Sequence, residues 1–508
     1  MSSIVLNAAT QSPMVRTLAR VPNKEGSFTV GVPDNIPPVQ REVFPVNAAT
    51  TGFQTLSSST QNRIAVPETG HLDTIDLKFT VQFPQVAAES NMFAPGASMF
   101  AYELWDRVEL TSHNRVIETL YSTEVVARIM RKGGDCLRRE QDRARLIVDN
   151  ALEEQVETSR GQAVLGVPDG ERRTMYARLP FSCLESPDRN FDTRFCENLE
   201  LKIHYRNPNE IINCKDDTAN TGVNNVTDGS PISLSVAVEA QMAFRTFHDL
   251  TEANIRDANF VKDNATAILA MDTVRQIYNP PTSTENQWVI DLSSNVYCKE
   301  LLIAVVREKA DAPMVGGSAD ATVISKGLPG ETGHKFYRYS GDSKIVPYLV
   351  SQESGDVLPC LNKIELLAQG RVLYEATLRE NQIVHQRDFQ LMTPDNHQPY
   401  TSGLTSTSTR NGFIRIKNCL SDSELYNSGG IALQSVNNPQ LRLTFDSNVN
   451  SGTRTEKFDA TAESFVSNGG ASTISLNARK YQCHVFYRHY QMIRIDSNTG
   501  GVSRSMDV

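Results

Sequence analysis

Short stretches in which apolar and polar residues alternate dominate the chain, and this pattern predicts half-buried β-strands. Within residues 63–246 these stretches read LDTIDLKFTVQF, ELWDRVEL, RVIETL, TMYARLPF, LELKIHY and ISLSVAVEAQMAF. A second series reads QWVIDLS, KELLIAVV, KIELLA, RVLYEA, GFIRIKN, QLRLTF and QCHVFYRHYQMIRI. Many strands separated by turn residues, with very little helix between them, predict antiparallel β-domains of the sandwich or barrel type.

One phrase occurs in both series. Residues 106–117 align without a gap with residues 362–373, and eight of the 12 positions are identical or similar. Each copy predicts a β-hairpin whose turn lies at His113-Asn114 or at Gln369-Gly370, because Asn and Gly tolerate a positive φ there. A helix is expected after each hairpin, capped by Ser122 in the first copy and by a capping box of Thr377 and Glu380 in the second.

Three weaker correspondences follow in the same order along the chain. They pair RLPFSCL from Arg178 with RIKNCL from Arg415, LELKIHY from Leu199 with QLRLTF from Gln440, and LSVAVEAQM from Leu234 with CHVFYRHYQM from Cys483. A repeat this long predicts two similar domains side by side. We expect an extended, proline-rich arm over residues 1–50, a first domain over 51–247, a linker and second domain over 248–497, and a tail over 498–508.

Length, cysteine usage and charge narrow the class of protein. The 508 residues suffice for two domains with cores that need no stapling. Eight cysteines are scattered with no CxxC pair, which predicts free thiols and a reducing compartment. No secretory leader pattern and no run of 18 apolar residues occurs, so we expect a soluble chain. The formal charge of -9 argues against a protein that coats nucleic acid.

One basic segment departs from this acidic balance. A helix is expected over residues 138–159, with Ala144, Val148, Ala151, Leu152 and Val156 on one face. The basic residues in and before it are Arg128, Arg131, Lys132, Arg138, Arg139, Arg143 and Arg145. Two interpretations stay open: a surface helix with solvated or paired charges, and a patch that touches DNA or an acidic partner.

The sequence carries no motif typical of an enzyme. GxSxG, GxGxxG and HExxH are absent, and GETGHK from Gly330 lacks the spacing of a phosphate-binding loop. Of nine histidines only His484 and His489 are close, and a separation of five places them on opposite faces of a strand, as ordinary strand residues. We therefore expect no enzyme, no catalytic, cofactor-binding or metal-binding residues, and no cofactor.

The last long strand carries a specific resemblance. VFYRHYQMIRIDSNTGG, residues 485–501, resembles the closing strand of the double jelly-roll major capsid proteins of eukaryotic DNA viruses, a lineage of giant viruses, virophages and polinton-like viruses. Tyr490, Ile493, Arg494, Ile495, Gly500 and Gly501 occupy matching places, with Gln491 where Asn is frequent and Tyr487 offset by one. VELTSHNRVIE, residues 108–118, is similar to the family hairpin VEL-x-IGG-x-x-I, with His113-Asn114 in place of Gly-Gly.

This resemblance implies an all-β fold of two tandem eight-stranded antiparallel jelly-roll sandwiches, with a few short helices and long loops. It implies a major capsid protein that forms pseudo-hexameric homotrimeric capsomers of an icosahedral shell, located in the virion. Residues 310–344 and 393–412 would be tower loops. The N-terminal arm would lie beneath the capsomer, against minor proteins or an internal membrane. Penton or cement proteins are further expected partners, and sequence-specific nucleic acid is not.

A non-viral tandem β-sandwich that binds or hydrolyses carbohydrate is the alternative. It predicts clustered aromatic residues on a concave face, whereas the chain has only two tryptophans, Trp105 and Trp288. Under either function Val108, Leu110, Ile364 and Leu366 should face inward. Arg494 is expected either in a trimer or domain contact or in a salt bridge at the end of a strand.

Overall fold

The computed structural model describes the chain in segments. They are residues 39–82, 90–94, 99–132, 139–140, 142–144, 163–165, 172–185, 191–208, 213–216, 234–247, 265–279, 287–292, 296–307, 348–350, 357–359, 361–377, 380–381, 414–419, 429–445, 453–455, 457–459, 464–466, 473–475, 481–496 and 501–505.

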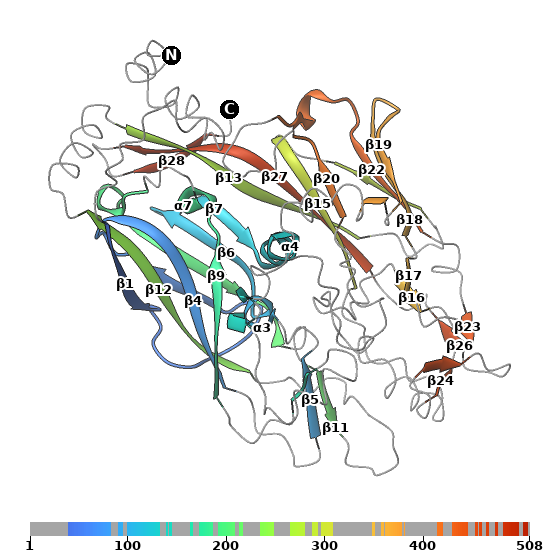
Figure 1. The fold of residues 1–508 in the computed structure, drawn as a ribbon, viewed down its shortest axis with the longest axis horizontal. Coiled ribbons are helices and arrows are strands. Elements are labelled where there is room, and N and C mark those ends of the chain that lie inside the picture. Colours follow the sequence, from blue (N-terminus) through green and yellow to red (C-terminus); the bar gives the residue numbers. More distant parts are fainter. Residues whose placement is uncertain are drawn as a thin grey trace.

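A five-stranded and a four-stranded antiparallel sheet are the main sheets of the first half of the molecule (Figure 1). The first sheet has the order β1 (Val39–Asn47), β12 (Ser235–Phe247), β4 (His71–Gln82) and β9 (Arg172–Leu179), and short β2 (Gln54–Thr55) also pairs with β12. The second has the order β3 (Gln61–Ala65), β10 (Leu199–Tyr205), β6 (Trp105–Ser112) and β7 (Arg115–Tyr121).

The second half repeats this arrangement. One sheet has the order β13 (Ala265–Tyr278), β27 (Tyr481–Asp496), β15 (Tyr297–Arg307) and β20 (Ile414–Lys417). Short β21 (Ile431–Ala432) pairs with β15, and β28 (Val502–Ser505) pairs with β27. The other sheet has the order β14 (Gln287–Asp291), β22 (Gln440–Phe445), β18 (Leu361–Ala368) and β19 (Arg371–Ala376).

Both halves have the same strand connections. When the eight main strands of each half are numbered along the chain, strands 1, 8, 3 and 6 form one sheet and strands 2, 7, 4 and 5 form the other. Eight strands in two packed sheets with these long crossings form a jelly roll. The chain is therefore two jelly rolls in tandem, as the resemblance implied.

The remaining elements are short. They are β5 (Ser90–Ala94), β8 (Ala163–Leu165), β11 (Asn213–Asp216), β16 (Tyr348–Val350), β17 (Val357–Pro359), β23 (Thr453–Thr455), β24 (Lys457–Asp459), β25 (Ser464–Val466), β26 (Thr473–Ser475), α3 (Phe100–Glu103), α4 (Ser122–Lys132), α7 (Ser182–Glu185), and the 3-10 turns η2 (Thr193–Phe195) and η6 (Leu433–Ser435). No helix among the described residues is long and apolar enough to cross a membrane.

All four repeat correspondences fall on equivalent strands. The repeated phrase forms the β6–β7 and β18–β19 hairpins, and the weaker pairs fall on or at the ends of β9 and β20, on β10 and β22, and on β12 and β27. The turn residues have the predicted left-handed backbone, with φ of 48° and 62° at His113 and Asn114 and of 52° and 72° at Gln369 and Gly370. The duplication is thus a repeat of both sequence and topology.

Of the two predicted helix caps, the capping box is confirmed and the Ser122 cap is corrected. Thr377 and Glu380 form the capping box: the Thr377 amide donates to the Glu380 carboxylate at 2.8 Å, and the Glu380 amide donates to the Thr377 hydroxyl at 3.1 Å. Helix α4 begins at Ser122, but the Ser122 hydroxyl donates to the carbonyl of Tyr102. Ser122 therefore ties α4 to α3, because the distant carbonyl competes for its hydroxyl.

Two predicted segment limits are wrong. Residues 39–47 of the expected arm form β1, which pairs along its whole length with β12. Pro45 argued against a strand in the sequence, but β1 is at the edge of its sheet, where proline is tolerated. In the expected tail, β28 pairs with β27. Residues 1–38 lie outside the described residues, as do the two expected tower loops.

The core has two parts. Val108, Leu110, Ile364 and Leu366 are buried as predicted, the first pair in the core of the first jelly roll and the second pair in that of the second. The first cluster also takes in residues of the second jelly roll, namely Ile268, Ala270, Leu302, Ala304, Phe486, Ile493, Ile495 and Val502. The sheet containing β27 is therefore buried on both faces: one faces its own core and the other faces the first jelly roll.

Candidate functional site between the two jelly rolls

The outer face of the β13–β27–β15 sheet lies against β7, α4 and α7 of the first jelly roll, and β28 also lies against β7 (Figure 1). We call this contact the seam. It buries charged side chains from both jelly rolls among apolar ones. A buried charge is costly unless it is paired and hydrogen-bonded, so these partners fix how the two jelly rolls sit.

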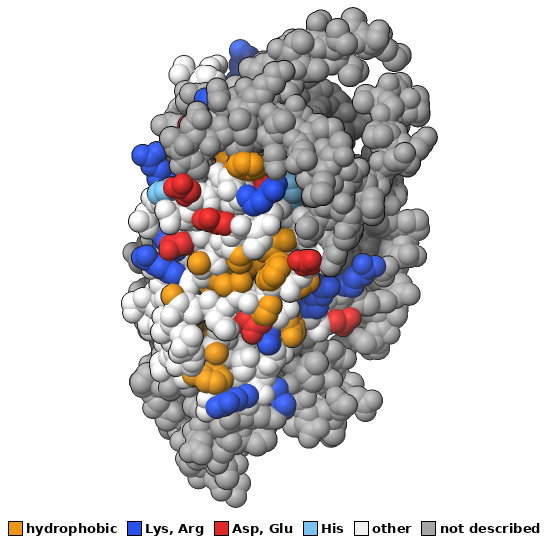
Figure 2. All heavy atoms as spheres, turned by 90° about the vertical axis from the view of Figure 1, so that its left-hand side faces the viewer, with side chains coloured by type: hydrophobic (Ala, Val, Ile, Leu, Met, Phe, Trp, Pro, Cys, Tyr) orange, Lys and Arg blue, Asp and Glu red, His pale blue; other side chains and the backbone are white. Residues whose placement is uncertain are grey.

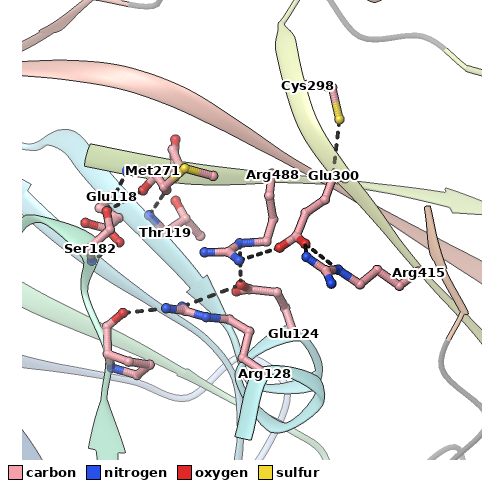
Figure 3. A network of polar contacts seen from close by, with 12 residues as sticks. Glu118, Thr119, Glu124, Arg128, Ser182, Met271, Cys298, Glu300, Arg415 and Arg488 are labelled. Carbon is pink, nitrogen blue, oxygen red and sulfur yellow. Dashed lines mark hydrogen bonds and ion pairs between the residues drawn. The ribbon is translucent and has the colours of Figure 1, made fainter. Parts of the chain in front are cut away.

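Arg488 of β27 is the centre of the largest cluster (Figure 3). Its Nε lies 3.1 Å from Glu124 of α4, and its terminal nitrogen lies 2.5 Å from Glu300 of β15. Glu300 also binds Arg415 of β20 at 2.6 Å, and Glu124 lies 3.6 Å from Arg128. All five side chains are at most 3% exposed. The chain of charges thus links α4 of the first jelly roll to three strands of the second.

Glu118 of β7 forms a second cluster with α7. Its carboxylate accepts the backbone amides of Ser182 at 2.7 Å and Cys183 at 3.2 Å. The Ser182 hydroxyl donates to the Met271 carbonyl of β13 at 2.8 Å and accepts the Met271 amide at 2.6 Å (Figure 3). Burial raises the pKa of Glu118 to about 8, and the neighbouring Asp272 adds to that rise. This carboxyl is therefore protonated in the folded chain near neutral pH.

Asp272 of β13 forms a third cluster. It accepts the Thr119 amide of β7 at 2.9 Å and pairs with Arg504 of β28 at 2.8 Å. His489 lies 4.0 Å away. Burial raises the pKa of Asp272 and lowers the pKa of His489. Arg504 belongs to the expected tail, so the end of the chain takes part in the seam.

Two further contacts cross the seam. The Gln491 side-chain amide of β27 donates to the Ile117 carbonyl of β7 at 2.9 Å. Arg275 of β13 binds both carboxylate oxygens of Asp106 on β6, at 2.7 and 2.9 Å. Burial alone would raise the pKa of Asp106, but the Arg275 guanidinium outweighs it and holds that pKa at about 2. The Asp106 carboxylate therefore stays charged at pH values at which an exposed carboxylate becomes protonated.

The histidines, Arg494 and the cysteines considered in the sequence analysis do not form a common site among the described residues. His484 and His489 both lie in β27 and are buried, and in the part of the chain that the structure describes no cluster of His, Cys, Asp or Glu could hold a metal ion. Arg494 is exposed, so it lies outside the seam, and its contact with another chain stays a prediction. Buried free thiols are found at Cys183, Cys196, Cys298 and Cys483.

The basic segment is partly corrected. Arg128 is 3% exposed, binds Glu124 and donates to the Pro180 carbonyl at 3.3 Å, so it cannot belong to a surface patch. Of the expected helix, residues 139–140 and 142–144 are described and helical, Ala144 is buried, and exposed Arg143 lies 3.8 Å from Glu140. Arg139 is exposed, and the side chains of the remaining basic residues lie outside the described part of the chain. Contact of this segment with nucleic acid stays a prediction.

Sequence reasoning missed the residues of the seam. Glu124 and Arg128 have the i, i+4 spacing of a helical ion pair, so their pairing could have been predicted from the sequence. Glu300 and Arg488 stand inside KELLIAVV and VFYRHYQM, where a charge in an otherwise apolar strand marks a buried partner. Which partner it meets depends on long-range pairing that one sequence does not reveal.

Comparison with known proteins adds evidence from structure. No family model matches the sequence, and no curated protein matches it. Solved structures do match. The PBCV-1 virus capsid, in a quasi-atomic model, aligns over 93% of this chain and 97% of its own with a TM-score of 0.56 and 13% identity. The Faustovirus major capsid protein aligns over 97% and 98% with a TM-score of 0.51 and 10% identity.

The chain has the fold of the viral double jelly-roll major capsid proteins. A further match is the PBCV-1 VP54 crystal structure fitted into a reconstruction of the virophage Sputnik, with 14% identity, a TM-score of 0.56, and coverage of 93% of this chain and 97% of that one. At such identities the likeness concerns the fold. Nearly the whole of both chains aligns, so the likeness takes in both jelly rolls.

Proposed function

We propose that the chain is the major capsid protein of an icosahedral virus and that three copies form a pseudo-hexameric capsomer. The observation that carries the proposal is the identical strand order of the two jelly rolls. Three such chains around a threefold axis present six similar domains, so the outline approaches a hexagon and can tile a shell. The seam supports this function because it holds the two domains of one chain in a fixed relation.

The fold likeness supports the same proposal. The matched proteins named as capsids align over nearly their whole length, so this chain spans the complete double jelly roll of those proteins. A structural, non-enzymatic role in the virion follows from the proposal. Self-association and contacts with minor capsid, penton or cement proteins would be its main interactions. The expected contact of the N-terminal arm with minor proteins or a membrane remains a prediction.

The mass of the purified chain in solution tests the proposal. Light scattering coupled to size exclusion should give about 169 kDa, three times the 56.4 kDa chain. A mass of 56.4 kDa at every concentration tested would argue against the capsomer. Binding to a carbohydrate array by such a monomer would favour the tandem-sandwich alternative.

A further inference from the structure

The β6–β7 and β18–β19 hairpins are equivalent in geometry as well as in sequence. In β6–β7 the register passes from the pair Leu110 and Glu118 to the pair Thr111 and Val116, so Ile117 is the bulged residue. In β18–β19 it passes from Leu366 and Tyr374 to Leu367 and Val372, so Leu373 is the bulged residue. The ungapped alignment places Ile117 on Leu373. The two bulges therefore present equivalent side chains.

The surroundings of these two residues differ. Ile117 is 1% exposed, lies in the first core cluster with residues of β13 and β27, and receives the Gln491 hydrogen bond across the seam. Leu373 is 54% exposed and its neighbour Val372 is 48% exposed. The same strand position is thus covered by a jelly roll in one half and open in the other.

The sheet that covers Ile117 also has an uncovered equivalent. The β13–β27–β15–β20 sheet buries most of its outer face in the seam, with Ile277 of β13 44% exposed, whereas the equivalent β1–β12–β4–β9 sheet exposes Val43 at 54% and Tyr176 at 37%. Their strand neighbours Phe44 and Met175 face the first core, so Val43 and Tyr176 point outward. Figure 2 shows the face on which β1, β12 and β4 lie, with hydrophobic side chains gathered near its centre and charged ones around them.

Both open surfaces carry ion pairs. On the sheet, Lys78 lies 3.3 Å from Glu239 and Arg245 lies 2.8 Å from Asp73. Beside the hairpin, Lys363 lies 2.8 Å from Glu375 and 2.9 Å from Glu365. Neither surface presents a block of one sign, so the two can approach without repulsion and bury their apolar residues.

We propose that Val372 and Leu373 of one copy dock on the outer face of the β1–β12–β4–β9 sheet of a second copy. The contact that forms the seam within one chain would then be repeated between two chains. The hairpin and the sheet are different surfaces of one chain, so the contact is heterologous and can close into a ring. This inference rests on the proposed function and assigns the residues that join its subunits.

The test compares two aspartate substitutions at exposed residues of one sheet. Leu373→Asp places a charge at the centre of the proposed contact, whereas Val289→Asp changes a 39% exposed residue of β14, at the opposite edge of that sheet. Association of Leu373→Asp should weaken by at least about 30-fold per contact, as expected for a central apolar anchor. Val289→Asp should associate like the wild type. Val43→Asp, on the other surface, should reproduce the loss.

Masses over a dilution series, measured with the unfolding temperature, separate the outcomes. The contact is supported if Leu373→Asp and Val43→Asp are monomers while the wild type and Val289→Asp are trimers. The two monomeric variants should also unfold at the temperature at which the wild-type monomer unfolds after dilution. Trimers of Leu373→Asp as stable as the wild type would overturn this contact and leave the capsomer standing. A wild-type chain that stays monomeric would overturn both.

Discussion

Replacing Arg488 by methionine should destabilise the whole chain, because this residue joins the two jelly rolls electrostatically. Methionine keeps much of the length of the side chain but removes the cation between Glu124 and Glu300. Glu300 retains Arg415 at 2.6 Å, whereas Arg128 lies farther from Glu124, at 3.6 Å. Glu124 therefore bears most of the loss. Removing one partner of a buried ion pair costs about 3–5 kcal/mol of unfolding free energy.

Thermal unfolding followed by circular dichroism measures this loss. Since about 1 kcal/mol shifts Tm by about 2–4 °C in domains of 150–250 residues, Arg488→Met should lower Tm by about 10 °C. Arg494→Met is the matched control, because Arg494 lies in the same strand but is exposed, and its change should stay within about 0.5 kcal/mol. Adding Glu124→Gln to Arg488→Met should recover part of the loss, with a coupling energy of about 1–3 kcal/mol.

The reasoning would be refuted by a Tm of Arg488→Met that equals that of Arg494→Met. It would also be refuted by strictly additive effects of Glu124→Gln and Arg488→Met, because additivity would mean that the two side chains do not stabilise each other across the seam.

Two further predictions concern the seam and the core. Glu118 has a folded pKa of about 8 against an ordinary value of 4.5, so its contribution to stability is complete below pH 4.5 and is lost as pH rises towards 8. Tm of the wild type should therefore fall between pH 6 and 8, by an amount equivalent to about 1.4 kcal/mol of unfolding free energy per pH unit. Glu118→Gln should lack this pH dependence. Equal slopes of Tm against pH in the two proteins would contradict the burial of a protonated carboxyl. Leu110→Ala and its counterpart Leu366→Ala should each lose about 2–5 kcal/mol in denaturant unfolding, and Leu110→Asp should prevent folding of the first jelly roll, whereas a wild-type Tm for Leu110→Asp would disprove its place in the core.

The sequence predicted what depends on local pattern. Alternation located most of the eight main strands of each jelly roll, and the tolerance of Asn114 and Gly370 for positive φ located both hairpin turns. The capping box at Thr377 and Glu380 was also readable, because its two partners stand three residues apart. The repeat turned these local elements into two equivalent domains before any strand pairing was known.

What escaped prediction depends on contacts between distant segments. Strand β1 lacks strong alternation around Pro45, and its conformation follows from pairing with β12 some 200 residues later. Arg128 looked like part of a basic surface, but it is a buried partner of Glu124, which itself meets Arg488 of the second jelly roll. Arg494 attracted interest through the family pattern, while Arg488, six residues earlier, carries the buried charge. Burial by another domain has no local sequence pattern.

An electron cryomicroscopy image of the purified assembly tests the central claim most directly. Viewed down its symmetry axis, the particle should show three copies of the chain as six similar lobes in a nearly hexagonal outline. Within each copy, the two jelly rolls should meet at the seam of β7 and α4 against β13, β15 and β27. A particle with two lobes, or one in which the two jelly rolls of a chain lie apart, would contradict the account.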